Sequence, residues 1–435
     1  MSFTMIGLLG LILLFVLIFF RMPVGFAMII TGVAGFSAIV NPDAAFSMMT
    51  NNLVDIFGSY SLTVIPLFIL MGQVAFHAGI SSRLFKAAYK WIGHWPGGMA
   101  IASIGACAGF SAICGSTNAT AATMAAVTIP EMKKYNYSDA ISTGVVAAAG
   151  SLGILIPPSV IFIIYGILTE QSIGELFMAG VLPGIILTLL FSFVVVIWSI
   201  LRPDSAPRGD KADMSERMRS LVGVGETIVL FILVMGGLFA GFFTPTEAGA
   251  VGAFGTIVLA LIKRSITFNQ LILSFMETTK ISCMILTIVA GATILGRFLA
   301  ITQIPFNIAD WVGGLSLPSW AIISIIILIY MIGGCFIDAL ALIMLTVPIF
   351  YPVVTSLGYS PVWFGVVIVL VTQIGVITPP VGINVYVVRS VATDVSLGTI
   401  FKGVLPLLAA IIIATFLLIV FPDIALYLPK IMSVK

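Results

Sequence analysis

The sequence predicts an all-α membrane protein that crosses the bilayer many times and consists of two halves of opposite orientation. The first observation is composition: 60% of the 435 residues are apolar and only 8% are charged, against about 25% charged residues in a soluble domain. The second is a series of motifs that recurs in order along the chain. The third is the distribution of basic residues. A net charge of +2 with scattered basic residues also argues against nucleic acid as a partner.

The spanning segments are predicted from apolar stretches long enough to cross a bilayer. Residues 3–20 form the first, and we interpret them as a helix rather than a signal peptide because no basic region precedes them. Residues 41–52 are expected to form an outer loop, and the amphipathic segments 80–93 and 303–313 to form helices along the membrane surface. The other spanning stretches are 23–40, 58–77, 139–165, 176–201, 222–242, 246–262, 281–300, 361–388 and 403–421.

Two further segments, 97–117 and 318–334, are rich in Gly, Ser and Cys and lead into the short apolar runs 119–132 and 338–352. Such segments are typical of re-entrant hairpins, which enter the membrane and leave on the same side. We therefore predict one hairpin in each half of the chain.

Two spanning stretches contain a double proline, Pro157-Pro158 in 139–165 and Pro379-Pro380 in 361–388. Proline removes a backbone donor and clashes with the preceding turn, so each pair should break its helix. A structural kink is the alternative. Because the two pairs lie at matching places, we favour two half-sites that use freed backbone groups to bind ions or substrate.

The recurring motifs define an internal repeat. Thr128-Ile129-Pro130 matches Thr346-Val347-Pro348 at a spacing of 218 residues, and the two double prolines match at 222. Tyr137-Ser138 matches Tyr359-Ser360 at 222, and residues 180–183 match 403–406 at 223. This register requires a four-residue insertion and aligns Thr120 with Asp338. It divides the chain into a first repeat, 1–201, a cytoplasmic linker, 202–220, and a second repeat, 221–435.

The orientation follows from the positive-inside rule. With the N-terminus outside, 16 of the 19 basic residues fall on the inner side, and only Arg297, Lys430 and Lys435 fall outside. The first hairpin then enters from the inner side and the second from the outer side. Inverted repeats with paired broken helices are typical of secondary transporters.

The polar residues within the membrane supply candidate ligands. Residues 111–120 (SAICGSTNAT) combine hydroxyl and amide groups, which suit sodium, although helix packing is an alternative for the small residues. Asp338 is the acidic residue deepest in an apolar stretch, and it could bind sodium, carry a proton or pair with a basic residue. Arg389 could bind a substrate carboxylate or extend to the inner interface, and Arg297 is equally ambiguous on the outer side.

Other function classes lack their motifs. No GxxxxGK[ST] nucleotide loop and no GxSxG nucleophile motif occurs. We therefore do not expect an enzyme or an ATP-driven pump. A channel would fit the hydropathy but not the paired broken helices.

Residues 111–138, followed by GSLGILIPPS and later by GGCFIDALALIMLTVPI and GVITPPVGIN, resemble the large membrane subunit of tripartite ATP-independent periplasmic (TRAP) transporters. The resemblance implies a multi-pass protein of the bacterial inner membrane, and the positive-inside rule places both of its termini in the periplasm. It implies sodium-driven import of an organic acid by an elevator motion. It also implies two partners: a periplasmic substrate-binding protein and a separate small four-helix membrane subunit.

The resemblance also implies the site residues. The first sodium half-site would contain Ser116, Thr117 and Asn118 at a hairpin tip, with Gly153, Ile156 and Pro157. The second would contain Gly334 and Asp338, with Gly375, Thr378 and Pro379. Candidate substrate contacts are Ser111, Ser159, Asn384 and Arg389.

The expected cargo is sialic acid (N-acetylneuraminate). The alternatives are a C4-dicarboxylate TRAP subunit and a standalone sodium-coupled dicarboxylate carrier.

Overall fold

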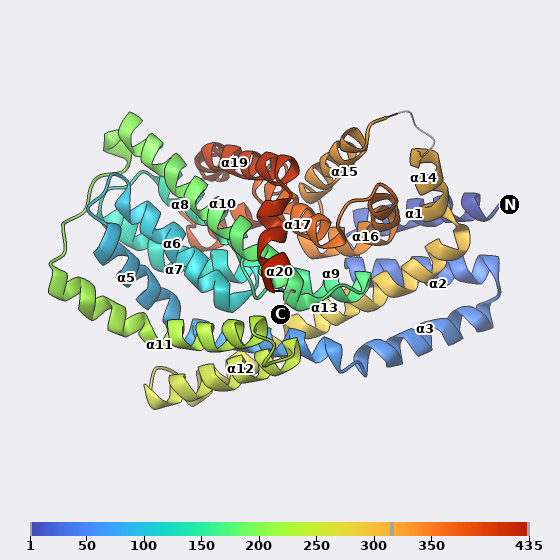
Figure 1. The fold of residues 1–435 in the computed structure, drawn as a ribbon, viewed down its shortest axis with the longest axis horizontal. Coiled ribbons are helices and arrows are strands. Elements are labelled where there is room, and N and C mark those ends of the chain that lie inside the picture. The colour runs from blue at the N-terminus through green and yellow to red at the C-terminus, as the bar shows by residue number, and fades with distance from the viewer. Residues whose placement is uncertain (1, 314–316, 433–435) are drawn as a thin grey trace.

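The computed structural model describes residues 2–313 and 317–432, and within these ranges every regular element is helical. The predicted all-α class is confirmed. Figure 1 shows an elongated molecule in which helices from both halves of the chain lie side by side. The helices of the first half are α1 (Phe3–Phe19), α2 (Val24–Ile39), α3 (Pro42–Phe57), α4 (Val64–His77), α5 (Ile80–Ile92), α6 (Gly98–Cys114), α7 (Thr117–Lys134), α8 (Asp139–Gly150), α9 (Val160–Thr169) and α10 (Ile173–Leu201).

The second half contains ten further helices and begins after the polar linker. They are α11 (Met214–Phe239), α12 (Pro245–Ile262), α13 (Phe268–Thr302), α14 (Ile304–Gly313), α15 (Ser319–Gly334), α16 (Ala339–Ser356), α17 (Pro361–Ile377), α18 (Ile383–Val391), α19 (Leu397–Val420) and α20 (Asp423–Met432). Three short 3-10 helices, η1 (Ser61–Thr63), η2 (Ser151–Ile154) and η3 (Pro203–Ser205), complete the described part of the chain.

Each predicted hairpin is a pair of helices joined by a short turn. Gly115, with φ of 65°, ends α6, and the Ser116 side chain caps α7 by accepting a hydrogen bond from the Ala119 N–H. In the second hairpin α15 ends at Gly334, and Asp338 caps α16 by accepting from the Leu340 N–H. The hairpins therefore extend beyond the predicted segments 97–117 and 318–334, because each includes the short apolar run that follows.

Both double prolines interrupt a helix as predicted. The α8–η2 segment ends at Ile154, and α9 begins at Val160 after the N-cap residue Ser159. In the second half α17 ends at Ile377, and α18 begins at Ile383 after Gly382, whose φ of 60° few other residues adopt. Both Pro-Pro peptide bonds are cis.

The register assigned to the hairpins from the sequence is wrong by one helical turn. Both α7 and α16 have 18 residues, and their N-cap residues, Ser116 and Asp338, stand 222 positions apart. At this spacing Asp338 corresponds to Ser116 rather than to Thr120. Pro130 then corresponds to Pro352, the second proline within α16, and no four-residue insertion is needed. The sequence pairs Pro130 with Pro348 because α16 contains two prolines four residues apart, and the first of them also follows a threonine by two residues.

The segment expected to be an outer loop, 41–52, is also different. It forms most of α3, with Asn41 as the N-cap and Pro42 in the first turn, and α3 meets the η1–α4 segment at a bend of 57°. This helix is not predicted by a search for apolar stretches, because the segment contains many polar side chains. The amphipathic segments 80–93 and 303–313 do form helices, α5 and α14.

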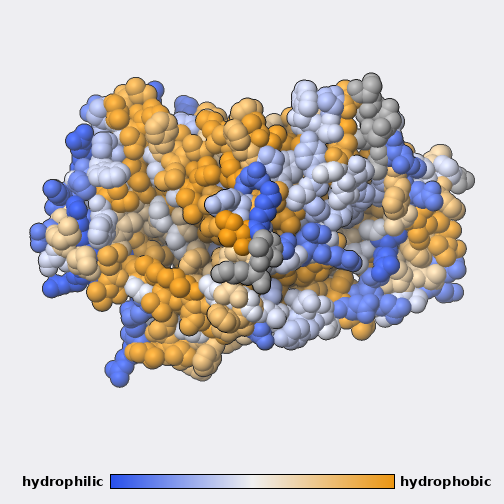
Figure 2. All heavy atoms as spheres, viewed as in Figure 1, coloured by the Kyte–Doolittle hydropathy of each residue, from blue (hydrophilic) through white to orange (hydrophobic). Residues whose placement is uncertain are grey.

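Six of the described helices are long and apolar enough to cross a membrane, or seven if the bent α3–α4 pair counts as one span. Figure 2 shows apolar side chains over much of one face, whereas hydrophilic side chains gather at the left end, where the linker between α10 and α11 runs. Large apolar side chains such as Leu189 and Phe193 on α10 are more than 60% exposed. Such a surface requires lipid or partner helices to cover it.

Small residues allow the helices of the two halves to approach closely. At the crossing of α8 and α19, a Cβ atom on Gly144 would overlap the backbone of Gly403, and one on Gly403 would overlap the Ala140 carbonyl oxygen. Close backbone approach at small residues is the usual mode of helix packing in membranes. This contact holds the first broken helix against the long helix that follows the second.

Candidate functional site

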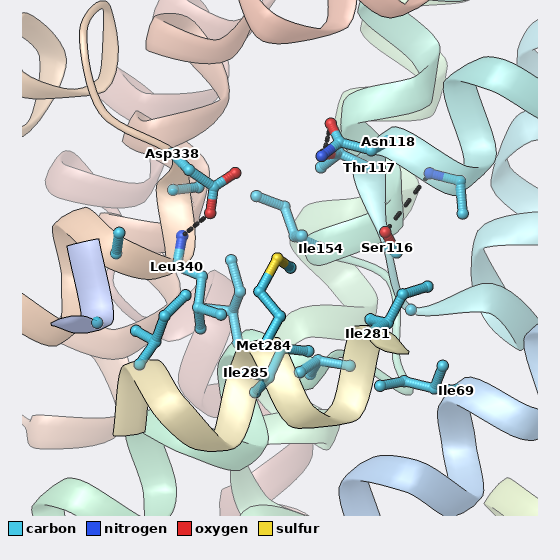
Figure 3. A pocket seen from close by; sticks show the side chains of 18 of the residues that line it. Ile69, Ser116, Thr117, Asn118, Ile154, Ile281, Met284, Ile285, Asp338 and Leu340 are labelled. Atoms are coloured by element: carbon cyan, nitrogen blue, oxygen red, sulfur yellow. Dashed lines mark hydrogen bonds between the residues drawn. The ribbon is translucent and has the colours of Figure 1, made fainter. Parts of the chain in front are cut away.

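A cavity of about 720 Å³ lies between the tips of the two hairpins. Its walls come from the N-terminal ends of α7, α16 and α2, from α4 and α9, and from the middle of α13. Figure 3 shows Ser116, Thr117 and Asn118 on one side and Asp338 with Leu340 on the other. Met284 and Ile285 of α13 lie between and below the two tips. The fold therefore brings together the two polar segments that the sequence singled out.

The first tip presents neutral oxygen and nitrogen atoms. Ser116 caps α7, and the Thr117 hydroxyl donates to Asn118 Oδ1 at 3.3 Å. The free N–H groups of the first turn of α7 point toward the tip, where the helix dipole favours negative charge. The same tip therefore offers hydroxyl oxygens to a cation and backbone donors to an anion.

The second tip presents a carboxylate. Asp338 Oδ2 accepts from the Leu340 N–H at 3.1 Å, and the side chain borders the cavity. Among the described residues that line the cavity, Asp338 is the charged one and none is Lys or Arg. Apolar side chains make up most of the remaining wall. An anion in this cavity would therefore need a cation bound with it, or backbone donors.

The helix breaks lie directly behind the tips. A Cβ atom on Gly153 would come within 2.5 Å of the Ser116 carbonyl oxygen, and one on Gly115 within 2.7 Å of the Pro158 carbonyl oxygen. In the second half a Cβ atom on Gly375 would overlap the backbone of Gly334. Each tip thus lies against its own break chiefly through backbone atoms.

The predicted ion-site residues differ in their distance from the cavity. Ser116, Thr117, Asn118 and Asp338 line the cavity, together with Ile154 of the first break. Gly153, Gly334 and Gly375 form the backbone contacts described above. The other predicted residues, Ile156, Pro157, Thr378 and Pro379, belong to the breaks and are not part of the cavity wall.

The donors present fit a hard monovalent cation. Hydroxyl, amide, carboxylate and backbone carbonyl oxygens are the ligands that such ions prefer. Across residues 2–313 and 317–432, no group of three or more His, Cys, Asp or Glu side chains could hold a metal ion. The oxygen atoms at the tips are therefore compatible with an alkali-metal ion.

The four candidate substrate contacts lie outside the cavity lining. Ser159 caps α9 and also donates to the Ile154 carbonyl, and Asn384 donates to the Ala147 carbonyl of α8. The Arg389 guanidinium donates to the Ala392 carbonyl at the end of its own helix, α18. Ser111 is fully buried within α6, and its hydroxyl has no hydrogen-bond partner in the described part of the chain.

The cavity also has walls that the sequence did not indicate. Gln73 of α4 and Thr287 of α13 contribute polar groups, and Phe26 and Met284 contribute apolar ones. Gln73 offered a usable signal, because it is an amide inside the apolar stretch 58–77. The α13 residues offered none, since their stretch resembles an ordinary membrane helix.

Comparisons with known proteins agree with this architecture. Residues 11–424 match the family described as the DctM component of the tripartite ATP-independent periplasmic transporter. A C4-dicarboxylate TRAP transporter large permease protein of Pseudomonas aeruginosa is 34% identical over 90% of this chain and 91% of its own length. The sialic acid TRAP transporter large permease protein of Vibrio cholerae is 33% identical, with coverages of 95% and 96%. The isethionate TRAP transporter permease protein of Oleidesulfovibrio alaskensis is 36% identical over 86% of this chain and 60% of its own.

Solved structures show the same fold at low sequence identity. The YdaH transporter of Alcanivorax borkumensis superposes with a TM-score of 0.60 at 14% identity, over 88% of this chain and 90% of its own. MtrF of Neisseria gonorrhoeae gives 0.57 at 17%, with coverages of 86% and 83%. With the family match over most of the chain, these findings identify it as a multi-pass membrane protein of the DctM family, the large permease component of TRAP transporters.

Proposed function

We propose that this chain is the sodium-coupled membrane subunit that imports sialic acid delivered by a periplasmic substrate-binding protein. The observation that carries the proposal is the cavity between the two tips, with a helix break touching the back of each tip. Sodium would bind at each tip, to Ser116, Thr117 and Asn118 on one side and to Asp338 on the other. The backbone around Gly153 and Gly375 would contribute the neighbouring carbonyl oxygens.

The lining supports a substrate with few charges. Its described residues include no Lys or Arg, and its charged residue, Asp338, is itself an acid. Placing a doubly charged dicarboxylate in this environment costs more than placing one carboxylate, because desolvation of each charge must be offset. N-acetylneuraminate carries one carboxylate and many hydroxyl groups, and the neutral groups of Gln73, Ser116, Thr117 and Asn118 suit it. C4-dicarboxylates are the second candidate, since several relatives are named for them.

The partners and the motion belong to the same proposal. The exposed apolar surface, such as that of α10, would receive the small four-helix subunit. The tips and breaks would move together as one transport unit against α2, α4 and α13, in an elevator cycle between the two faces of the membrane. The inverted relation of the halves would place both termini in the periplasm.

Uptake into proteoliposomes tests the proposal. The purified chain with its small subunit is reconstituted, and labelled N-acetylneuraminate is offered with and without an inward sodium gradient and a periplasmic binding protein. We expect uptake only when both are present. Uptake without a binding protein would instead indicate a standalone carrier, and uptake of succinate in preference to sialic acid would contradict the proposed cargo.

A further inference from the structure

A buried hydrogen bond joins the two broken helices at equivalent positions. Ser151 and Gln373 are both fully buried, and Ser151 Oγ lies 2.8 Å from Gln373 Oε1. Their spacing of 222 residues is that of the two double prolines and of the capping pair Ser116 and Asp338. Residues that contact their own symmetry equivalent must lie beside the axis that relates the two halves. The bond therefore joins the two helices a few residues before their breaks.

The bond is close to both tips. Ser151 precedes Gly153 by two residues, and Gly153 is pressed against the Ser116 carbonyl. Gln373 precedes Gly375 by two residues, and Gly375 is pressed against Gly334, where the turn that leads to Asp338 begins. A continuous series of tight contacts thus runs from one tip, through its break and the bond, to the other break and tip. Close-packed backbone atoms leave little room for one tip to move alone.

Stability alone does not account for this pair. The Ser151 hydroxyl also lies 2.7 Å from the Ala148 carbonyl, which can take its hydrogen. Whichever way the Gln373 amide is turned, one of its two polar atoms bonds Ser151. Gln373 Nε2 has no other partner in the described part of the chain. A buried polar atom without a partner lowers stability, so an apolar pair of similar volume would be a sounder purely structural contact.

We propose that the Ser151–Gln373 hydrogen bond couples the two sodium half-sites, so that an ion at one tip raises the sodium affinity of the other. This inference rests on the proposed sodium sites. Both residues are positioning residues, since neither lines the cavity. By linkage, disabling one half-site should weaken the other only while the bond is present.

The experiment measures sodium binding at the first tip only. In a chain whose four cysteines are replaced by alanine, Ala119→Cys places one thiol in the cavity wall beside Asn118. The rate of thiol labelling is measured against sodium concentration, with choline as the replacement ion. Asp338→Asn, which disables the other tip, should raise the half-protecting sodium concentration at least about five-fold, the lower end of typical coupling between sites.

Ser151→Ala and Gln373→Met each remove the bond. In either background Asp338→Asn should change the half-protecting concentration less than about two-fold, well below that coupling range. The exchanged protein, Ser151→Gln with Gln373→Ser, can form the bond in reverse and should regain the full effect. Tyr330→Phe is the matched control: it removes a buried hydrogen bond to Thr346 within one half, so the effect of Asp338→Asn should persist.

The outcomes separate two failures. If sodium gives no protection in the parent protein, the proposed sodium site at the first tip is wrong. If sodium protects but Asp338→Asn acts equally with and without the bond, the coupling proposal is wrong. Should the single variants fail to fold, the exchanged protein decides: it supports the proposal by showing the full effect and contradicts it by showing none.

Discussion

The two helix breaks share a backbone plan but lie in different surroundings. Residues 157–159 of the first break are buried, whereas Pro379 and Pro380 of the second are exposed. Two glycines of α10 explain the first: a Cβ on Gly180 would come within 2.6 Å of the Leu155 carbonyl oxygen, and one on Gly184 within 2.7 Å of Ile156. Gly403, which matches Gly180 in sequence, packs on α8 instead.

The two hairpin tips also differ in charge and in burial. The first carries neutral groups, and its Thr117 side chain is mostly buried. The second carries the Asp338 carboxylate, followed by a break that neighbouring helices do not enclose. The comparison shows that neighbouring helices cover the first break, whereas the second break is exposed at its two prolines.

The largest effect should come from adding a methyl group where tip and break touch. Gly375→Ala would press on the Gly334 backbone, and Gly153→Ala on the Ser116 carbonyl. We expect each to reduce uptake about a hundred-fold, as misplacements near 1 Å can do. Because both glycines are buried and both clashes involve backbone atoms, each variant should also destabilise the fold, by about 1–3 kcal/mol. Uptake assays and thermal unfolding measure the two effects.

Gly296→Ala serves as the control, since a Cβ there meets no atom within 4 Å. It should leave uptake and unfolding unchanged. Unaltered uptake and unfolding in Gly153→Ala and Gly375→Ala would contradict the tight contact between each tip and its break.

The second effect concerns the charges of the tips. Asp338→Asn retains the size of the side chain and an oxygen acceptor but removes the negative charge from the proposed cation site. We expect the sodium concentration for half-maximal uptake to rise on the order of ten-fold, which corresponds to about 1.4 kcal/mol. Ser116→Ala should raise it less, because a neutral ligand is lost, and should cost about 1 kcal/mol of stability as a missing helix cap. An unaltered sodium requirement in Asp338→Asn would return this residue to a purely structural role.

The third effect concerns the prolines themselves. Replacing both prolines of a break by alanine allows the helix to recapture carbonyl groups in i→i−4 bonds. If those carbonyls bind sodium, both double variants should need several-fold more sodium for uptake, while still reaching the membrane. The exposed pair, Pro379 and Pro380, should do so with the smaller loss of thermal stability. Wild-type sodium dependence in either variant would identify its prolines as simple kinks.

Much of this architecture could be predicted because its signals are local. Pro-Pro pairs, small-residue hairpins and apolar stretches act through the backbone of the segment that contains them. The register of the hairpins could not be predicted from the sequence. Thr346-Val347-Pro348 resembles Thr128-Ile129-Pro130, but the two triplets lie one helical turn apart once the helices are aligned. Only the N-cap positions of Ser116 and Asp338 correct it.

The remainder depends on contacts between distant segments. Three features join residues that are far apart in the sequence. They are the cavity wall formed by Met284 and Thr287, the bond between Ser151 and Gln373, and the covering of the first break by α10. Arg389 illustrates the same limit: its charge suggested a substrate contact, but the structure places its guanidinium on the carbonyl at the end of its own helix.

The smallest effect should appear at an exposed link between the halves. Lys133 at the end of α7 forms an ion pair with Asp394, which precedes α19. The hydrogen bond from Lys133 holds the pKa of the Asp394 carboxyl below its ordinary value of 3.8. A lowered pKa in the folded state contributes stability above the unfolded pKa, and this contribution is lost as pH falls through the folded value. Asp394→Asn should therefore lower the melting temperature slightly near pH 6, by no more than about 2 °C for such an exposed pair.

This difference should close as the pH falls below 3.8, and 1 M salt should also shrink it, because screening weakens exposed ion pairs. Melting curves of both proteins at several pH values, with and without salt, provide the measurement. Sodium-dependent uptake should be unchanged in Asp394→Asn. A large uptake defect in Asp394→Asn would instead mean that transport depends on this exposed ion pair between the halves.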